Sequence, residues 1–143
     1  MFLVMLVSHS VSFRVRIVET DFDGVAYYGS YFIYFDHARS DFMRKIGYSF
    51  SKLKSMGIET RIVSAHCDYK APLKYEDIVE VNIRLAKIGN TSIRFEYEIY
   101  RVDDVKQKTL CAVGYTVHVF VNENGRPTPP PDRLRTMLKK HLP

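Results

Sequence analysis

The sequence predicts an α+β fold in which an antiparallel sheet of about five strands wraps around one long central helix. Only one long segment, about Gly29 to Ile46, carries apolar residues at helical spacing. Most of the remaining chain alternates apolar and polar residues with the period of two that strands show. One helix can cover one face of such a sheet. The 143 residues suffice for a single domain, 1–143.

The first two elements are a strand and the long helix. Alternating apolar residues place one face of the strand in the core: Val11, Phe13, Val15 and Ile17. The helix should bury a stripe made of Tyr31, Phe35, Ala38, Phe42 and Ile46. Gly47 is expected to end the helix.

Four more strands follow a short irregular or helical stretch from about Phe50 to Gly57. Alternating or β-branched residues predict them at Arg61 to Tyr69, Ile78 to Leu85, Thr91 to Arg101 and Thr109 to Val121. Beyond them, Asp132 is expected to cap a short amphipathic helix that carries Leu134, Met137 and Leu138. One helix leaves the outer face of the sheet bare, and dimerisation is one way to cover it.

Composition is a weak guide to partners. The formal net charge of +5 suits an anionic partner such as a nucleotide-bearing substrate or a nucleic acid. The basic residues are scattered, so a solvated surface explains most of them and no nucleic acid is expected. Cys67 and Cys111 are far apart and form no disulfide framework, which favours a cytoplasmic location. The apolar Met1 to Val7 is too short for a membrane span and is interpreted as a disordered end or a strand extension.

An acidic, glycine-containing loop, Glu19 to Tyr31, stands directly before the long helix. A helix start exposes unpaired N–H groups and is electropositive, so it can hold a developing oxyanion. Asp21 could then act as nucleophile or as general base toward water. The alternative is that Asp21 and Asp23 are ordinary turn and capping residues. The five histidines show no metal-ligand spacing, so no metal is expected. The chain shows no Walker loop or dinucleotide fingerprint, and no cofactor is expected.

Several motifs along the chain are shared with one family. They are Glu19-Thr20-Asp21, Gly24-Val25, Tyr28, Tyr31 and Asp36-His37-Ala38-Arg39. On these residues the chain resembles hotdog-fold acyl-CoA thioesterases of the 4-hydroxybenzoyl-CoA thioesterase type, including the branch associated with the Tol–Pal cluster. The resemblance implies a single hotdog thioesterase domain that hydrolyses an acyl-CoA. It also implies that the smallest active unit is a homodimer or a dimer of dimers.

The resemblance assigns roles to individual residues. Asp21 would be the essential carboxylate, and the backbone N–H near Tyr28 would be the oxyanion donor. Gly24 and Val25 would contact the substrate. Asp36 would lie near a ring hydroxyl of the substrate, unless it is a solvated helix carboxylate. Ser64 would line the acyl pocket, unless it faces a neighbouring chain. A hotdog module that binds acyl-CoA or an acylated carrier without turnover is the alternative function.

Overall fold

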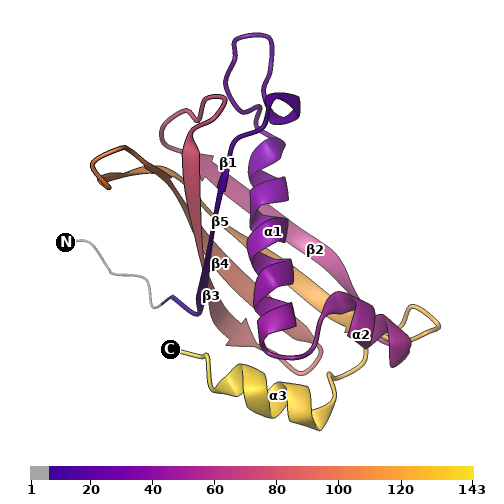
Figure 1. Cartoon of the computed structure of the whole chain (residues 1–143). Helices are drawn as coiled ribbons and strands as arrows, with labels where there is room; N and C mark the ends of the chain where they lie inside the picture. Colours follow the sequence, from indigo (N-terminus) through magenta and orange to yellow (C-terminus); the bar gives the residue numbers. More distant parts are fainter. Residues whose placement is uncertain (1–6) are drawn as a thin grey trace.

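The computed structural model describes residues 7–143 and forms one antiparallel sheet with a long helix across its inner face (Figure 1). The strands, in the order of the sheet, are β1 (His9–Arg14), β3 (Ile78–Ile88), β4 (Ser92–Val102), β5 (Lys108–Val121) and β2 (Glu59–Tyr69). The helices are α1 (Ser30–Lys45), α2 (Phe50–Ser55) and α3 (Asp132–Lys139), and a 3-10 turn covers Ile17–Glu19. Of the apolar opening, residues 1–6 lie outside the described residues.

The core lies between α1 and the inner face of the sheet. The predicted stripe on α1 is buried, from Tyr31 to Ile46. Alternate residues of the two central strands face it: Val79, Val81, Ile83, Leu85, Ile93, Phe95, Tyr97 and Ile99. Because successive side chains of a strand point to opposite faces, this alternation orients the whole sheet toward the helix. The α+β arrangement of five strands around one long helix is confirmed.

The first strand is shorter than predicted. It ends at Arg14, and Ile17 is 66% exposed, so the prediction that Ile17 shares the buried face is wrong. The Glu19 carboxylate accepts hydrogen bonds from the backbone N–H of Arg16 at 2.8 Å and from its Nε at 2.7 Å. These contacts close a 3-10 turn, which interrupts the period-two pattern after Val15.

The C-terminal helix braces the far end of the sheet. Leu134 and Leu138 of α3 are fully buried, and Arg135 donates to the carbonyls of Gly89 and Asn90 at 2.9 and 2.6 Å. Asp132 is the first residue of α3 instead of its cap, a position where its charge still favours the helix start. None of the helices described in 7–143 combines the length and hydrophobicity needed to cross a bilayer.

Strand β2 differs from the other strands because it is exposed along most of its length. It pairs with β5 on one side, and no further strand among residues 7–143 pairs with its outer edge. Ile62 and Val63 are 54% and 61% exposed, at a bulge in the pairing with β5. An apolar, unpaired sheet edge of this kind favours pairing with another chain.

Candidate active site

The loop before α1 folds into a tight hairpin that projects from one end of the molecule (Figure 1). Thr20 pairs with Ala26, and the Asp21 N–H donates to the Val25 carbonyl at 2.8 Å. Gly24 has a φ of +79°, a conformation that residues with a β-carbon rarely adopt. The sequence motif therefore builds a defined hairpin, which fixes where Asp21 lies.

Asp21 is exposed and uses one carboxylate oxygen to brace the hairpin. Its Oδ1 accepts from the N–H of Asp23 at 2.8 Å and from the N–H of Val25 at 3.4 Å. The part of the chain described here provides no donor to Oδ2. The turn role expected of Asp21 is thus present, and it occupies only one of the two oxygens. The second oxygen is available for chemistry.

Glu19 ties the hairpin to the start of α1. Its side chain is 95% buried and also accepts a hydrogen bond from the Tyr34 hydroxyl at 3.1 Å. Its carbonyl accepts from the Ser30 hydroxyl at 2.8 Å and from the Tyr27 N–H at 3.1 Å. Burial and then the Glu19 carboxylate raise the pKa of Tyr34, so the phenol stays a donor. Glu19 is an anchor that positions the Asp21 hairpin.

A Glu19→Ala variant should be destabilised by about 1–3 kcal/mol, because it leaves the buried Tyr34 hydroxyl and the Arg16 N–H without their acceptor. Urea unfolding of the two proteins measures the difference. Glu123→Ala is the matched control, since Glu123 is exposed in the turn that follows β5. Equal stability of the Glu19→Ala and wild-type proteins would contradict the anchoring role.

Tyr28 lies between the hairpin and the helix. Its N–H has no backbone acceptor among residues 7–143, while its carbonyl accepts from the Tyr69 hydroxyl at 2.8 Å. Gly29 follows as the N-cap and α1 begins at Ser30. Tyr28 is therefore tied to β2 through its carbonyl, while its N–H, which belongs to the preceding peptide group, is unused close to the electropositive end of a 16-residue helix.

A pocket of about 360 Å³ opens beside this amide. Residues from the loop, α1 and the end of β2 line it: Ala26, Tyr28, Tyr31, Tyr69, Lys70, Ala71 and Pro72. The rings of Tyr31 and Tyr69 meet edge to face, with centroids 4.9 Å apart. Burial raises the pKa of each of these phenols to about 12, so both remain neutral near pH 7. Ala26 pairs with Thr20 at the base of the Asp21 hairpin, so the hairpin adjoins the pocket through Ala26.

The structure brings some of the predicted residues together and leaves others apart. Asp21, Gly24 and Val25 share the hairpin, and Tyr28 follows it. Asp36 lies six residues after Ser30, the first residue of α1, which is about 9 Å along the helix axis at 1.5 Å per residue. It is exposed and pairs with Arg39 at 2.9 Å.

Ser64 lies on β2, away from the hairpin. It pairs with Val117, whereas its neighbour Ala65 pairs with the buried Thr116. Alternation along the strand thus places Ser64 on the face opposite to Ala65. Within one chain Ser64 is not next to Asp21, and its contact with substrate stays a prediction.

Two residues of this site were missed from the sequence. Tyr69 was only the predicted end of a strand, and Glu19 only the first acid of a motif. The signal for Glu19 was its spacing of three from Arg16, but nothing local links Tyr69 to Tyr28, 41 positions away. Among residues 7–143, no three His, Cys, Asp or Glu side chains converge as metal ligands would.

Comparison with known proteins defines the class. Residues 15–138 match the model of the Thioesterase-like superfamily. A putative esterase of Aquifex aeolicus is 34% identical over 126 residues, which are 88% of this chain and 94% of that one. The acyl-CoA thioester hydrolase YbgC of Escherichia coli is 25% identical over 91 residues, 64% of this chain and 68% of that one. The solved structure of a gentisyl-coenzyme A thioesterase superposes on this chain with a TM-score of 0.78 and 27% sequence identity. The alignment covers 92% of this chain and 99% of the thioesterase.

These matches identify a thioester hydrolase with a hotdog fold. The chain belongs to the Thioesterase-like superfamily, and the resemblance drawn from the sequence motifs is confirmed.

Proposed function

We propose that this protein hydrolyses acyl-CoA thioesters to the free acid and CoA, with Asp21 as the essential carboxylate. The observation that carries the proposal is the Tyr28 N–H. It has no backbone acceptor in 7–143, stands at the start of α1, and borders a pocket with the Asp21 hairpin at its margin. A thioester carbonyl bound there would place its oxygen on an amide that stabilises the negative charge of the tetrahedral intermediate.

Two routes fit a carboxylate in this place. As general base, Asp21 takes a proton from water, the hydroxide adds to the thioester carbon, and the C–S bond breaks as CoA thiolate leaves and is protonated. As nucleophile, the carboxylate attacks the same carbon and expels the thiolate, which leaves an acyl-aspartyl anhydride that water then hydrolyses. Both routes use the free Oδ2 of Asp21 and the Tyr28 amide.

The other predicted residues would contact the substrate around this centre. Gly24 and Val25 form the side of the hairpin next to Asp21, where the missing side chain of Gly24 would let the thioester approach. Asp36 would accept a hydrogen bond from a ring hydroxyl of the acyl group. Ser64 would line the acyl pocket from β2 of a neighbouring chain. The gentisyl-coenzyme A thioesterase is named for a hydroxylated aromatic acyl group, which agrees with a ring hydroxyl near Asp36.

We further propose a homodimer, or a dimer of dimers, built on the free edge of β2. Pairing two β2 strands would cover Ile62 and Val63 and would satisfy the edge N–H and C=O groups. Because Tyr69 ends β2 beside the pocket, an antiparallel partner strand would bring its own 61–69 segment toward the same pocket. The active site would then combine the Asp21 hairpin of one chain with β2 of the other.

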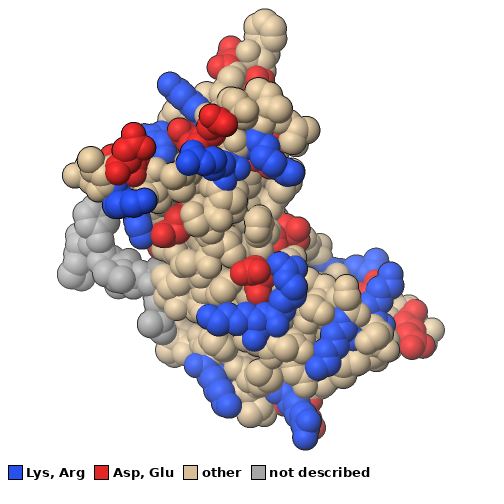
Figure 2. Space-filling model, viewed as in Figure 1, with Lys and Arg blue, Asp and Glu red and all other residues tan. Residues whose placement is uncertain are grey.

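A panel of aliphatic and aromatic acyl-CoAs tests the activity. We expect release of free CoA thiol with a kcat/KM of at least about 10⁴ M⁻¹s⁻¹ for the preferred acyl group. A non-catalytic acyl-CoA or acyl-carrier binding module, the alternative, would bind the same esters and release no thiol. Basic and acidic side chains are interspersed over the face drawn in Figure 2, which does not favour a nucleic-acid partner.

A further inference from the structure

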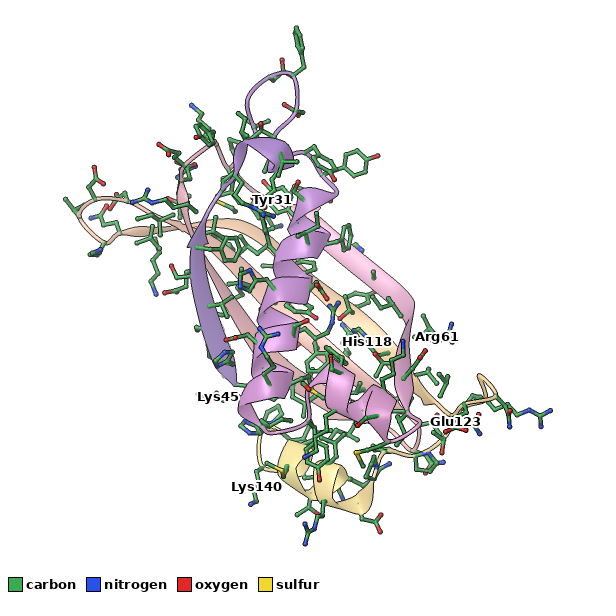
Figure 3. All side chains as sticks on the ribbon, turned by 45° about the vertical axis from the view of Figure 1, so that its right-hand side comes forward. Tyr31, Lys45, Arg61, His118, Glu123 and Lys140 are labelled. Atoms are coloured by element: carbon green, nitrogen blue, oxygen red, sulfur yellow. The ribbon has the colours of Figure 1, made fainter. Side chains whose placement is uncertain are left out.

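A chain of buried polar groups runs from α1 into the sheet. Arg39 is 94% buried. Its two terminal nitrogens donate to Asp36 Oδ1 at 2.9 Å and to the Tyr97 hydroxyl at 3.0 Å. The chain continues from the Tyr97 hydroxyl to Thr116 Oγ1 at 2.7 Å and from there to His118 Nε2 at 2.8 Å. Figure 3 shows His118 inside the molecule, on the side of α1 that faces β2.

The donor at the start of this chain is Arg39, because arginine only donates. Tyr97 therefore accepts from Arg39, while either hydroxyl can be the donor between Tyr97 and Thr116. Burial, followed by the charge of Arg39, lowers the pKa of His118 to about 3, so the imidazole is neutral. Its Nδ1 has no hydrogen-bond partner in the described part of the chain.

Two features of this arrangement disfavour stability. The cation is buried, but its carboxylate partner Asp36 has a side chain that is 61% exposed. The far end of the chain leaves the buried Nδ1 of His118 without a hydrogen-bond partner among residues 7–143. Apolar residues of the same volume would avoid both costs. What the chain does achieve is to hold the Arg39 guanidinium, and through it Asp36 Oδ1, in one place.

We propose that Arg39 is a positioning residue for substrate recognition: the buried chain fixes Arg39, and Arg39 fixes Asp36 so that Oδ2 can accept a hydrogen bond from a hydroxyl on the acyl group. This inference rests on the proposed function, which places Asp36 at the substrate. A benzoyl group with a hydroxyl at its far end, plus one hydrogen bond, spans the distance from the start of α1 to Asp36.

A mutant cycle with 4-hydroxybenzoyl-CoA and benzoyl-CoA tests the proposal, because the two esters differ by one hydroxyl. Asp36→Asn should lower kcat/KM for the hydroxylated ester by about tenfold, through KM, and leave benzoyl-CoA unchanged. Arg39→Met should have the same effect. Tyr97→Phe, which keeps the ring stacked on Phe35, should produce about a threefold loss.

The decisive measurement is kcat/KM of a double variant. If Arg39 acts through Asp36, then Asp36→Asn combined with Tyr97→Phe is no worse than Asp36→Asn alone. Additive losses, or equal losses on both esters, would overturn the proposal. Tyr100→Phe is the control, a tyrosine on the same strand outside the chain. If Arg39→Met does not fold, Tyr97→Phe still tests the role of Arg39, because it removes the hydroxyl that accepts from Arg39.

The same cycle can be run without turnover. Dissociation constants of the two esters, measured by calorimetry in an Asp21→Asn background, should show the same selective and non-additive losses. If the wild type hydrolyses no ester of the aliphatic and aromatic panel, the proposed function fails, and the binding cycle still decides the role of Arg39. Equal affinity of all variants for 4-hydroxybenzoyl-CoA would overturn the positioning role even if hydrolysis is confirmed.

Discussion

An Asp21→Asn protein should fold like the wild type and lose about a thousandfold in kcat, because an amide can neither accept the proton of water nor attack the thioester. The fold should persist since the asparagine Oδ1 can still accept from the N–H groups of Asp23 and Val25, and the side chain is exposed. Thiol release from an acyl-CoA substrate measures the loss, and urea unfolding checks the fold.

Asp23→Asn is the matched control, two residues away in the same hairpin. The Asp23 side chain is exposed and accepts no hydrogen bond from residues 7–143, so turnover should stay close to that of the wild type. Equal losses in the two variants would mean that the hairpin acts as an undivided acidic cluster. Full activity of Asp21→Asn would remove Asp21 from the mechanism.

Features that repeat along the chain could be predicted from the sequence. The stripe on α1 depends on a spacing of three to four residues, and the faces of β3 and β4 on a spacing of two, so local pattern suffices. The Asp21 hairpin also follows from a local signal, because Gly24 takes a positive φ. The end of β1 did not follow the pattern, since the side chain of Glu19 closes a turn that alternation does not reveal.

Contacts between distant segments could not be predicted. Arg39 follows a helical pattern as a polar residue, yet it is buried because Tyr97, 58 positions later, supplies its acceptor. Tyr69 meets the Tyr28 carbonyl only after β2 has crossed the sheet. Such pairs depend on the strand order β1-β3-β4-β5-β2, which the alternation of single strands does not contain.

The exposure of β2 gives the oligomer proposal its physical basis. Its inner face carries Ile62 and Ala65, which are exposed beside the buried His118 and Thr116 of β5. Helix α1 packs on the β1 and β3 side of the sheet and leaves this face uncovered. A second copy of the chain pairing along β2 would cover the edge and complete the pocket wall. The consequence can be measured by mixing two inactive chains.

Mixing Asp21→Asn with Ala65→Trp should restore activity that neither variant has alone. The tryptophan would fill the pocket wall supplied by β2, while the asparagine removes the carboxylate supplied by the hairpin. In a mixed dimer with shared sites, both defects fall in one pocket and neither in the other. After complete subunit exchange at equal concentrations, the rate should reach about a quarter of the wild-type rate, because half the dimers are mixed and each has one intact site.

The mixture also separates shared from self-contained sites. No recovery, with subunit exchange verified by light scattering and labelled chains, would mean that each chain carries a complete site. Ser64→Trp in place of Ala65→Trp tests the predicted contact of Ser64, which register places on the opposite face of β2. If Ser64→Trp is inactive alone and complemented in the mixture, the bulge at 62–64 turns Ser64 toward the partner's pocket. If Ser64→Trp is fully active alone, the pocket is lined by the Ala65 face of β2 and Ser64 has no part in it.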